Sequence, residues 1–255
     1  MSMRANTALD TLHAGGTVLN GWIGTGSPHV AEVMANQRFD TVLVDFQHGS
    51  ASSDMAATLF CTILNAGAIP LARVGSTAPS EIMRLLDLGA FGVMGPLIDN
   101  AEEAAAFAAA CRYPPRGQRS FGPARAATLM GPDYTPDGAD ARVMVMVQIE
   151  TKQALDNLEE IAATEGVDGL YLGPADLALA LGYPLVMDDV GAEMTAILDR
   201  VVAAAEAAGK FAGVHAAGGE FARRAKDRGA RFVTVGSDTA LIAESAKRRL
   251  ALFHE

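Results

Sequence analysis

Short apolar runs alternate along the chain with longer amphipathic stretches that are rich in alanine. The apolar runs have few polar residues at alternate positions, which is typical of strands in a parallel sheet covered on both faces. Strands are predicted at residues 19–24, 41–46, 69–74, 92–98, 143–150, 169–173, 211–215 and 232–236. The amphipathic stretches predict helices at 28–36, 53–65, 79–87, 101–112, 152–163, 191–208, 219–228 and 239–252.

Eight strands that are each followed by a helix predict an α/β fold of the (β/α)8 TIM-barrel type, and the 255 residues fit a single barrel domain over 1–255. The competing fold is an open doubly wound sheet, which calls for a glycine-rich dinucleotide fingerprint after the first strand. Gly24 and Gly26 follow that strand, but Ser27 and Pro28 come next and no third glycine has the required spacing. Ser27 is instead predicted to cap a helix that begins at Pro28, which favours the barrel.

The composition limits the classes of partner. A formal net charge of −10 argues against nucleic acid or an anionic membrane surface as a partner. No apolar stretch approaches the roughly 18 residues of a membrane span, and the first residues lack the apolar core of a signal peptide. Cys61 and Cys111 form no CxxC pair, so they are interpreted as reduced thiols of a cytoplasmic protein.

One segment interrupts the alternation. Residues 113–142 contain five prolines, and a loop of this length in a compact barrel is usually functional. A lid or a subunit contact is one interpretation, and a surface excursion without chemistry is the other.

Polar residues collect where the predicted strands end, which is the edge at which barrel enzymes build their active sites. These positions are Asp45, Gln47, His48, Arg73, Pro96, Gln148, Glu150, the run 173–176, His215, Ser237 and Asp238. Trp22, in the first strand, is interpreted as core or pocket wall. Packing alone gives no reason to gather a histidine, an arginine and several acids at one rim, because unpaired buried charges are costly.

Glu150 and Asp176 follow two consecutive predicted strands, so their carboxylates are expected at the same end of the sheet. Each acid by itself is explained as a first-turn residue that interacts with the dipole of the following helix. Together they favour ligation of a hard divalent cation such as Mg²⁺, Mn²⁺ or Co²⁺, among which two carboxylates do not distinguish.

His48 and Arg73 are the candidate groups for proton transfer and charge stabilisation. His48 taken alone is also consistent with a structural histidine, whereas beside a metal it is a candidate general base. Arg73 either pairs with a nearby acid or binds a carboxylate or developing oxyanion, which suits its fixed fork of donors. The four lysines lie outside the predicted strands, which argues against Schiff-base chemistry at a buried lysine.

Several stretches resemble the HpcH/HpaI aldolases, a family of metal-dependent class II pyruvate aldolases. The matching motifs are VDFQHG (44–49), PLAR (70–73), LLDLGA (85–90), RYPPRGQR (112–119), VQIE (147–150) and GVDGLYLGPADL (166–177). The likeness runs in order from about Gly21 to the C-terminus, and the YPPxG and GPADL motifs are specific in combination.

The resemblance implies a role for each matching position. It implies that Glu150 and Asp176 hold the metal, and that a 2-oxo acid is bound by Arg73, Gln148, Gly173, Pro174, Ala175 and Asp176. It further implies that His48 moves the proton, Arg73 stabilises the oxyanion and Asp87 tunes the basicity of His48. Asp87 belongs to a helix-to-strand turn at the far end of its own barrel, so it reaches a His48 through unusual local geometry or from an adjacent subunit.

The implied reaction is reversible aldol cleavage of a 4-hydroxy-2-oxo acid to pyruvate, or a hydroxylated pyruvate, and an aldehyde. The implied assembly is a homo-hexamer in which the C-terminal helices, here 239–252, are exchanged between barrels. Two positions depart from the family pattern: Gln47 stands where glutamate is common, and His215 stands where the residue is usually apolar. Either departure is expected to change the polarity of the pocket.

Two other functions remain open at this stage. A CoA-ester lyase of the malyl or citramalyl type shares the barrel and two acidic ligands, but it needs a groove for the CoA arm that the sequence does not reveal. A non-catalytic oxo-acid-binding barrel is the alternative from a different class, with Gln47 as the mark of lost turnover.

Overall fold

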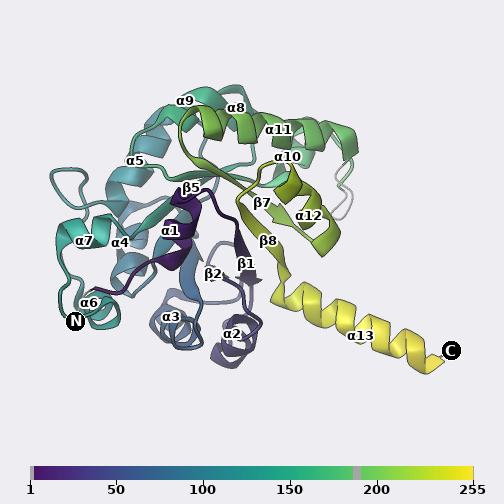
Figure 1. The fold of residues 1–255 in the computed structure, drawn as a ribbon, viewed down its shortest axis with the longest axis horizontal. Helices are drawn as coiled ribbons and strands as arrows, with labels where there is room; N and C mark the ends of the chain where they lie inside the picture. Colours follow the sequence, from purple (N-terminus) through teal and green to yellow (C-terminus); the bar gives the residue numbers. More distant parts are fainter. Residues whose placement is uncertain (1–2, 186–190, 255) are drawn as a thin grey trace.

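The computed structural model describes residues 3–185 and 191–254 and confirms the predicted barrel. Eight parallel strands pair in chain order and close where β1 meets β8 (Figure 1). The strands are β1 (Val18–Ile23), β2 (Thr41–Asp45), β3 (Ile69–Arg73), β4 (Gly92–Gly95), β5 (Met144–Ile149), β6 (Gly169–Leu172), β7 (Phe211–Ala216) and β8 (Phe232–Ser237). All eight predicted strands are present, with ends that differ by up to three residues.

Helices surround the sheet in Figure 1. They are α1 (Thr7–His13), α2 (Pro28–Ala35), α3 (Ala56–Asn65) after the short 3₁₀ turn η1 (Ser53–Met55), α4 (Pro79–Asp87), α5 (Ala101–Cys111), α6 (Ala124–Met130), α7 (Pro136–Asp140), α8 (Lys152–Asp156), α9 (Leu158–Ala163), α10 (Pro174–Leu181), α11 (Gly191–Ala207), α12 (Gly219–Asp227) and α13 (Asp238–His254). The predicted cap is confirmed, since the Ser27 side chain accepts a hydrogen bond from the backbone N–H of Val30 and Pro28 begins α2.

The apolar residues form two layers, which explains why the strands read as near-continuous apolar runs. One layer, which includes Val42 and Val44, packs outward against the helices. The other fills the barrel interior and includes Leu43, Leu71 and Phe232. Successive strand residues therefore point alternately into these two layers, and both faces of the sheet are buried.

The segment 113–142 packs at the end of the barrel where the strands begin. It contains the unpredicted helices α6 and α7, and the buried Asp140 carboxylate accepts hydrogen bonds from the backbone N–H of Tyr113. Asn6, the N-cap of α1, connects this region to the start of β4 by donating to the carbonyls of Phe91 and Arg142. The segment thus lies opposite the mouth, so a lid over the mouth of the same subunit is excluded, and a subunit contact stays a prediction.

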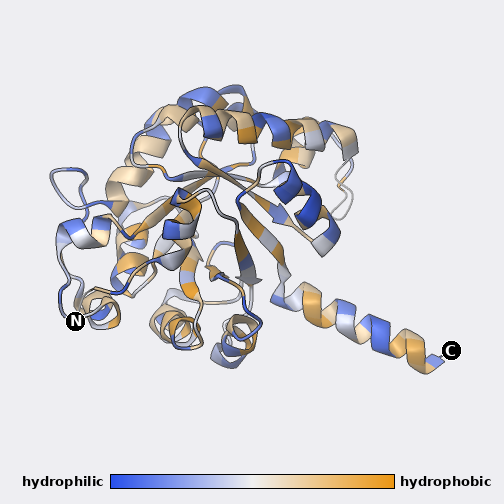
Figure 2. Ribbon diagram, viewed as in Figure 1, coloured by the Kyte–Doolittle hydropathy of each residue, from blue (hydrophilic) through white to orange (hydrophobic). Residues whose placement is uncertain are grey.

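The C-terminal helix α13 extends away from the barrel (Figures 1 and 2). Asp238 at its first turn is buried and anchors it, because its carboxylate accepts hydrogen bonds from the backbone N–H groups of Gly24 and Thr25. Toward its end, Leu250, Leu252 and Phe253 are exposed, and Figure 2 shows the hydrophobic positions along this helix. Across the described residues, no helix has the length and apolar character needed to span a membrane.

Candidate active site

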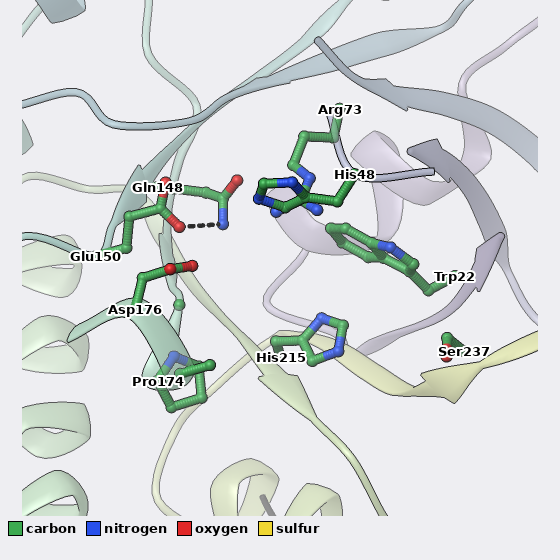
Figure 3. Close-up of a pocket in the computed structure, with 11 residues that line it drawn as sticks. Trp22, His48, Arg73, Gln148, Glu150, Pro174, Asp176, His215 and Ser237 are labelled. Carbon is green, nitrogen blue, oxygen red and sulfur yellow. Dashed lines mark hydrogen bonds between the residues drawn. The ribbon is translucent and has the colours of Figure 1, made fainter. Parts of the chain in front are cut away.

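A cavity of about 250 Å³ opens at the mouth of the barrel, where the strands end (Figure 3). Its lining contains every predicted site residue except Asp87. The lining residues are Trp22, His48, Arg73, Gln148, Glu150, Gly173, Pro174, Ala175, Asp176, His215 and Ser237. Eight predicted residues from four separated segments of the sequence therefore meet at one pocket, because parallel strands bring their carboxyl ends to the same rim.

Glu150 stands directly after β5 and is 2% exposed. One carboxylate oxygen accepts a hydrogen bond from the backbone N–H of Leu97 (2.8 Å) and the other from the side-chain amide of Gln148 (2.8 Å). Burial, with a smaller contribution from the negative charge of Asp176, raises the pKa of Glu150 to about 7 against the opposing Leu97 hydrogen bond. Helix α8 begins only at Lys152, so Glu150 is not a helical first-turn acid.

Asp176 lies in the first turn of α10, so the helix-dipole interpretation applies to it as well as the ligand interpretation. Figure 3 shows its carboxylate next to that of Glu150 on one side of the pocket. No helix was predicted between 163 and 191, yet Pro174 at the first helical position starts α10 there. The N-terminal end of α10 thus places the exposed Asp176 beside the buried Glu150.

Arg73 is held by Asp45, a residue that sequence analysis placed at the rim but gave no role. The two residues are direct neighbours in the β2–β3 register. Arg73 Nε donates to Asp45 Oδ1 at 2.9 Å and Nη2 donates to Oδ2 at 2.5 Å, with both residues buried. Burial alone raises the pKa of Asp45, but the hydrogen bonds and charge of Arg73 hold it below its usual value. Its place beside Arg73 on an adjacent strand was the signal that sequence analysis missed.

Trp22 and the loop after β2 also contact the Asp45–Arg73 ion pair and hold it in place. The indole N–H of Trp22 donates to Asp45 Oδ2 at 3.3 Å, and the Arg73 guanidinium carbon lies 4.8 Å from the centre of the indole ring. Asp45 Oδ1 also accepts from the backbone N–H groups of Gln47 (3.0 Å) and His48 (3.2 Å). These bonds hold the loop that carries His48, whose exposed imidazole lines the same cavity as Arg73 (Figure 3).

Gln148 and Gly173 shape the floor of the pocket beside Glu150. The side-chain carbonyl oxygen of Gln148 is buried and has no hydrogen-bond partner within the described part of the chain, as is also true of Gln47 Oε1. A Cβ atom at Gly173 would lie 2.8 Å from Glu150 Oε2 and 3.3 Å from Gln148 Nε2. Only glycine at this position leaves room for the Glu150 carboxylate.

Asp87 is the one predicted site residue that lies outside the pocket. It ends α4 at the opposite end of the barrel, where its carboxylate accepts a hydrogen bond from Arg119 at 2.7 Å. Arg119 is 2% exposed and also lies over the ring of Tyr113. Within one subunit the structure therefore does not bring Asp87 to His48, and its effect on a His48 of another subunit stays a prediction.

The donor set at the mouth is suited to a hard cation that has few protein ligands. In residues 3–185 and 191–254, no three or more histidine, cysteine, aspartate or glutamate side chains gather as a metal site. Glu150 and Asp176 supply two carboxylates, and Gln148 presents an unpaired carbonyl oxygen nearby. Mg²⁺ is commonly bound by one or two carboxylates with water and substrate oxygens completing the shell. The residues present therefore fit such an ion.

A closed parallel barrel with acids, an arginine and a histidine around a small mouth cavity defines a (β/α)8-barrel enzyme with a site for a small polar substrate. Comparison with known proteins gives the particular family. The chain belongs to the HpcH/HpaI aldolase/citrate lyase family, whose model matches residues 20–245, so the resemblance inferred from the motifs is confirmed.

The relatives match over nearly their full length. The chain is 37% identical over 237 residues to a hydroxypyruvate/pyruvate aldolase of Rhizorhabdus wittichii, covering 93% of this chain and 94% of the relative. It is 36% identical over 251 residues to a 4-hydroxy-2-oxo-heptane-1,7-dioate aldolase of Salmonella paratyphi C, covering 97% and 94%. A crystal structure of a family protein from Burkholderia cenocepacia superposes with a TM-score of 0.91 at 30% identity, covering 98% of this chain and 100% of that chain.

Proposed function

We propose that this protein catalyses the reversible, metal-dependent aldol cleavage of a 4-hydroxy-2-oxo acid to an aldehyde and pyruvate or a hydroxylated pyruvate. The observation that carries the proposal is the meeting of Glu150 and Asp176 with Arg73 and His48 in one cavity. The relatives named as aldolases, which match almost the whole chain, support the same reaction.

The proposed cofactor is Mg²⁺, Mn²⁺ or Co²⁺ held by Glu150 and Asp176. When bound, such an ion acts as a Lewis acid that draws charge from the 2-oxo group. The ion also offsets the repulsion between the two carboxylates that contributes to the raised pKa of Glu150. Gln148 and the start of α10, at Gly173, Pro174 and Ala175, are proposed to orient the carboxylate and carbonyl of the oxo acid, since they line the same cavity as Glu150 and Asp176.

Arg73 and His48 are proposed to carry the charge and the proton. His48 takes the proton from the C4 hydroxyl, the C4–O bond becomes the aldehyde carbonyl, and the electrons of the C3–C4 bond pass to the oxo acid as an enolate. Arg73, fixed in orientation by Asp45, stabilises the negative charge on the enolate oxygen. Protonation at C3 by the His48 imidazolium then yields the free oxo acid and returns His48 to its neutral form.

The proposed assembly is a homo-oligomer, a hexamer by the family resemblance, in which α13 packs on a neighbouring barrel. The exposed Leu250, Leu252 and Phe253 at the end of this helix support the exchange, because an unpaired apolar face is costly in water. Such an assembly is also the arrangement in which Asp87 of one subunit acts on His48 of another. The two free cysteines, one of them buried, support a cytoplasmic location.

The proposal is tested by pyruvate release in a coupled assay, across a panel of 4-hydroxy-2-oxo acids and with the metal varied. Glu150→Gln and Asp176→Asn are expected to abolish both turnover and divalent-metal binding measured by calorimetry. Asp227→Asn is the matched control, because Asp227 lies on α12 in an exposed pair with Arg223. Full activity of the wild-type enzyme in EDTA would contradict the proposal.

The same assay separates the alternatives. Consumption of an acyl-CoA without pyruvate release from free hydroxy-oxo acids would identify a CoA-ester lyase. Binding of metal and pyruvate without any aldol chemistry would identify a non-catalytic binding barrel.

A further inference from the structure

A chain of hydrogen bonds crosses the otherwise apolar interior of the barrel and ends at the active-site cavity. The Thr41 hydroxyl donates to Asn20 Oδ1 at 2.8 Å, and Asn20 Nδ2 donates to Thr234 Oγ1 at 2.9 Å. Thr234 Oγ1 lies 2.6 Å from the hydroxyl of Tyr171, which in turn lies 3.3 Å from Nδ1 of His215. The first four of these residues have no exposed surface. Such a buried polar chain is costly unless each member is paired.

The requirement that every buried proton has an acceptor fixes the direction of this chain. Thr234 Oγ1 already accepts a hydrogen bond from the Asn20 amide. Within the described residues, the hydroxyl oxygen of Tyr171 is the one acceptor for the hydroxyl proton of Thr234. If Tyr171 donated to Thr234 instead, the Thr234 proton would be left buried without a partner. Tyr171 therefore accepts from Thr234 and directs its own proton to Nδ1 of His215.

A His215 ring that accepts at Nδ1 carries its proton on Nε2. Burial, reinforced by the positive charge of Arg73, lowers the pKa of His215 to about 4, so the imidazole is neutral near pH 7. The edge-on contact with Trp22, at 4.8 Å between ring centres, holds the ring in place. Since Nδ1 is turned to Tyr171 and the residue lines the cavity, Nε2 is the nitrogen that remains for the pocket.

The position of His215 decides which part of a substrate it reaches. Figure 3 shows His215 below Trp22 on the side of Ser237, across the cavity from Gln148 and Glu150. The carboxylate and 2-oxo group of the substrate are therefore not its partners in the proposed reaction. An uncharged N–H donor matches an uncharged oxygen acceptor, whereas the charged groups are left to Arg73.

We propose that His215 determines substrate specificity by donating a hydrogen bond from Nε2 to a hydroxyl oxygen carried outside the carboxylate–oxo unit, and that Tyr171 and Thr234 position it for this. The inference rests on the proposed aldol reaction and specifies its substrates as hydroxylated ones. The hydroxyl belongs either to the oxo acid, as in hydroxypyruvate, or to the aldehyde, as in glycolaldehyde. Both present the same acceptor.

The kinetic test compares kcat/KM ratios in the direction of aldol addition, with each variant checked for folding by circular dichroism. One ratio is hydroxypyruvate against pyruvate with a fixed aldehyde, and the other is glycolaldehyde against acetaldehyde with pyruvate. His215→Leu is expected to lower one ratio about 2- to 10-fold, the effect of one neutral hydrogen bond. His215→Gln, which keeps a side-chain N–H donor, is expected to restore at least part of it.

The ratio that changes identifies the source of the hydroxyl, and a change in either one supports the proposal. The proposal is overturned if both ratios are unchanged in His215→Leu, including the case in which kcat/KM falls by the same factor for both substrates of each pair. A wild-type enzyme without aldol turnover would refute the proposed function instead. The specificity is then judged by calorimetric binding of hydroxypyruvate against pyruvate in the wild type and in His215→Leu, with the same two outcomes.

A second test reads the tautomer directly and needs neither metal nor turnover. The ¹⁵N shifts of the His215 ring, assigned by comparison with His215→Gln, are expected to show a proton on Nε2 and none on Nδ1 in the wild type. Tyr171→Phe removes the hydroxyl that fixes this state, so a mixture of tautomers is expected there. A proton on Nδ1 in the wild type, or an unchanged spectrum in Tyr171→Phe, would overturn the positioning role.

Discussion

Replacement of Asp45 by asparagine is expected to weaken both the fold and catalysis, because this one carboxylate holds the mouth of the barrel together. It pairs with Arg73 through two hydrogen bonds of 2.9 and 2.5 Å, and it also accepts from the Trp22 indole and from two backbone N–H groups. Asp45 is 4% exposed and Arg73 is 7% exposed, so water has little access to the Arg73 guanidinium once the carboxylate charge is removed. Asparagine keeps the size of the side chain, but it removes the charge and replaces one accepting oxygen by an NH2 group, which faces N–H donors whichever way the amide is turned.

The expected loss in the free energy of unfolding is about 3 kcal/mol, the lower end of the range for removing one partner of a buried ion pair. Most of this cost comes from leaving the Arg73 guanidinium buried without a counter-charge. Catalysis is expected to fall about 100-fold or more, because displacement of a charge-stabilising group by about 1 Å has an effect of this size. The loss should appear in kcat more than in KM, since Arg73 is proposed to act on the developing enolate.

The assay is urea unfolding followed by circular dichroism, together with pyruvate release at saturating substrate. A double-mutant cycle with Arg73→Met measures the coupling within the pair. The loss in the free energy of unfolding of the double variant is expected to be smaller than the sum of the two single losses by at least about 1 kcal/mol. Asp227→Asn, which breaks an exposed pair, is the control and should change stability by less than about 1 kcal/mol. A loss below about 1 kcal/mol for Asp45→Asn, or strict additivity in the cycle, would refute this reasoning.

Two further predictions concern Gly173 and His215. Gly173→Ala would place Cβ 2.8 Å from Glu150 Oε2, so we expect calorimetry to show metal affinity at least about tenfold weaker, as for other groups that support metal ligands. Gly219→Ala, where the added Cβ meets nothing within 4 Å, is the control, and equal affinities in the two variants would contradict the steric argument. The pKa of His215 is about 4 in the folded protein against 6.5 for the free group, so between pH 6.5 and 4 the unfolded chain binds more protons. The free energy of unfolding should therefore fall by up to roughly 3 kcal/mol as the pH drops through this window, with the full stability present above pH 6.5. His215→Gln should remove this acid-dependent loss in urea titrations at both ends of the window, and an identical pH dependence in both proteins would show that another group is responsible.

The local pattern of the chain was enough to predict the barrel, because apolar runs and amphipathic stretches record which face of each element is buried. The elements that were missed have weak local signals. No helix was predicted for α1, α6, α7 or α10; α1 and α10 are short, and α6 and α7 lie in a proline-rich segment that gives no helical period. The predicted helix at 152–163 is divided at Asn157 into α8 and α9.

The sequence alone also identified most of the lining of the cavity, since in a parallel barrel any polar residue that ends a strand must lie at the mouth. The order of residues along the chain does not record which strand ends contact each other. The pairing of Asp45 with Arg73 follows from the register between β2 and β3, and the contact between Tyr171 and Thr234 requires β6 and β8 to converge on the barrel interior. The placement of Asp87 beside Arg119, at the end away from the cavity, was likewise decided by the packing of α4 on the segment that follows α5.

The sequence by itself therefore determined the eightfold alternation, the buried faces and the set of polar residues at the rim, because these depend on periodicity and position within single elements. Only the tertiary structure decided which of those residues are partners and which candidate is left outside the cavity. Hydrogen bonds between strands depend on register and ring closure, which join residues as far apart in the chain as Asn20 and Thr234.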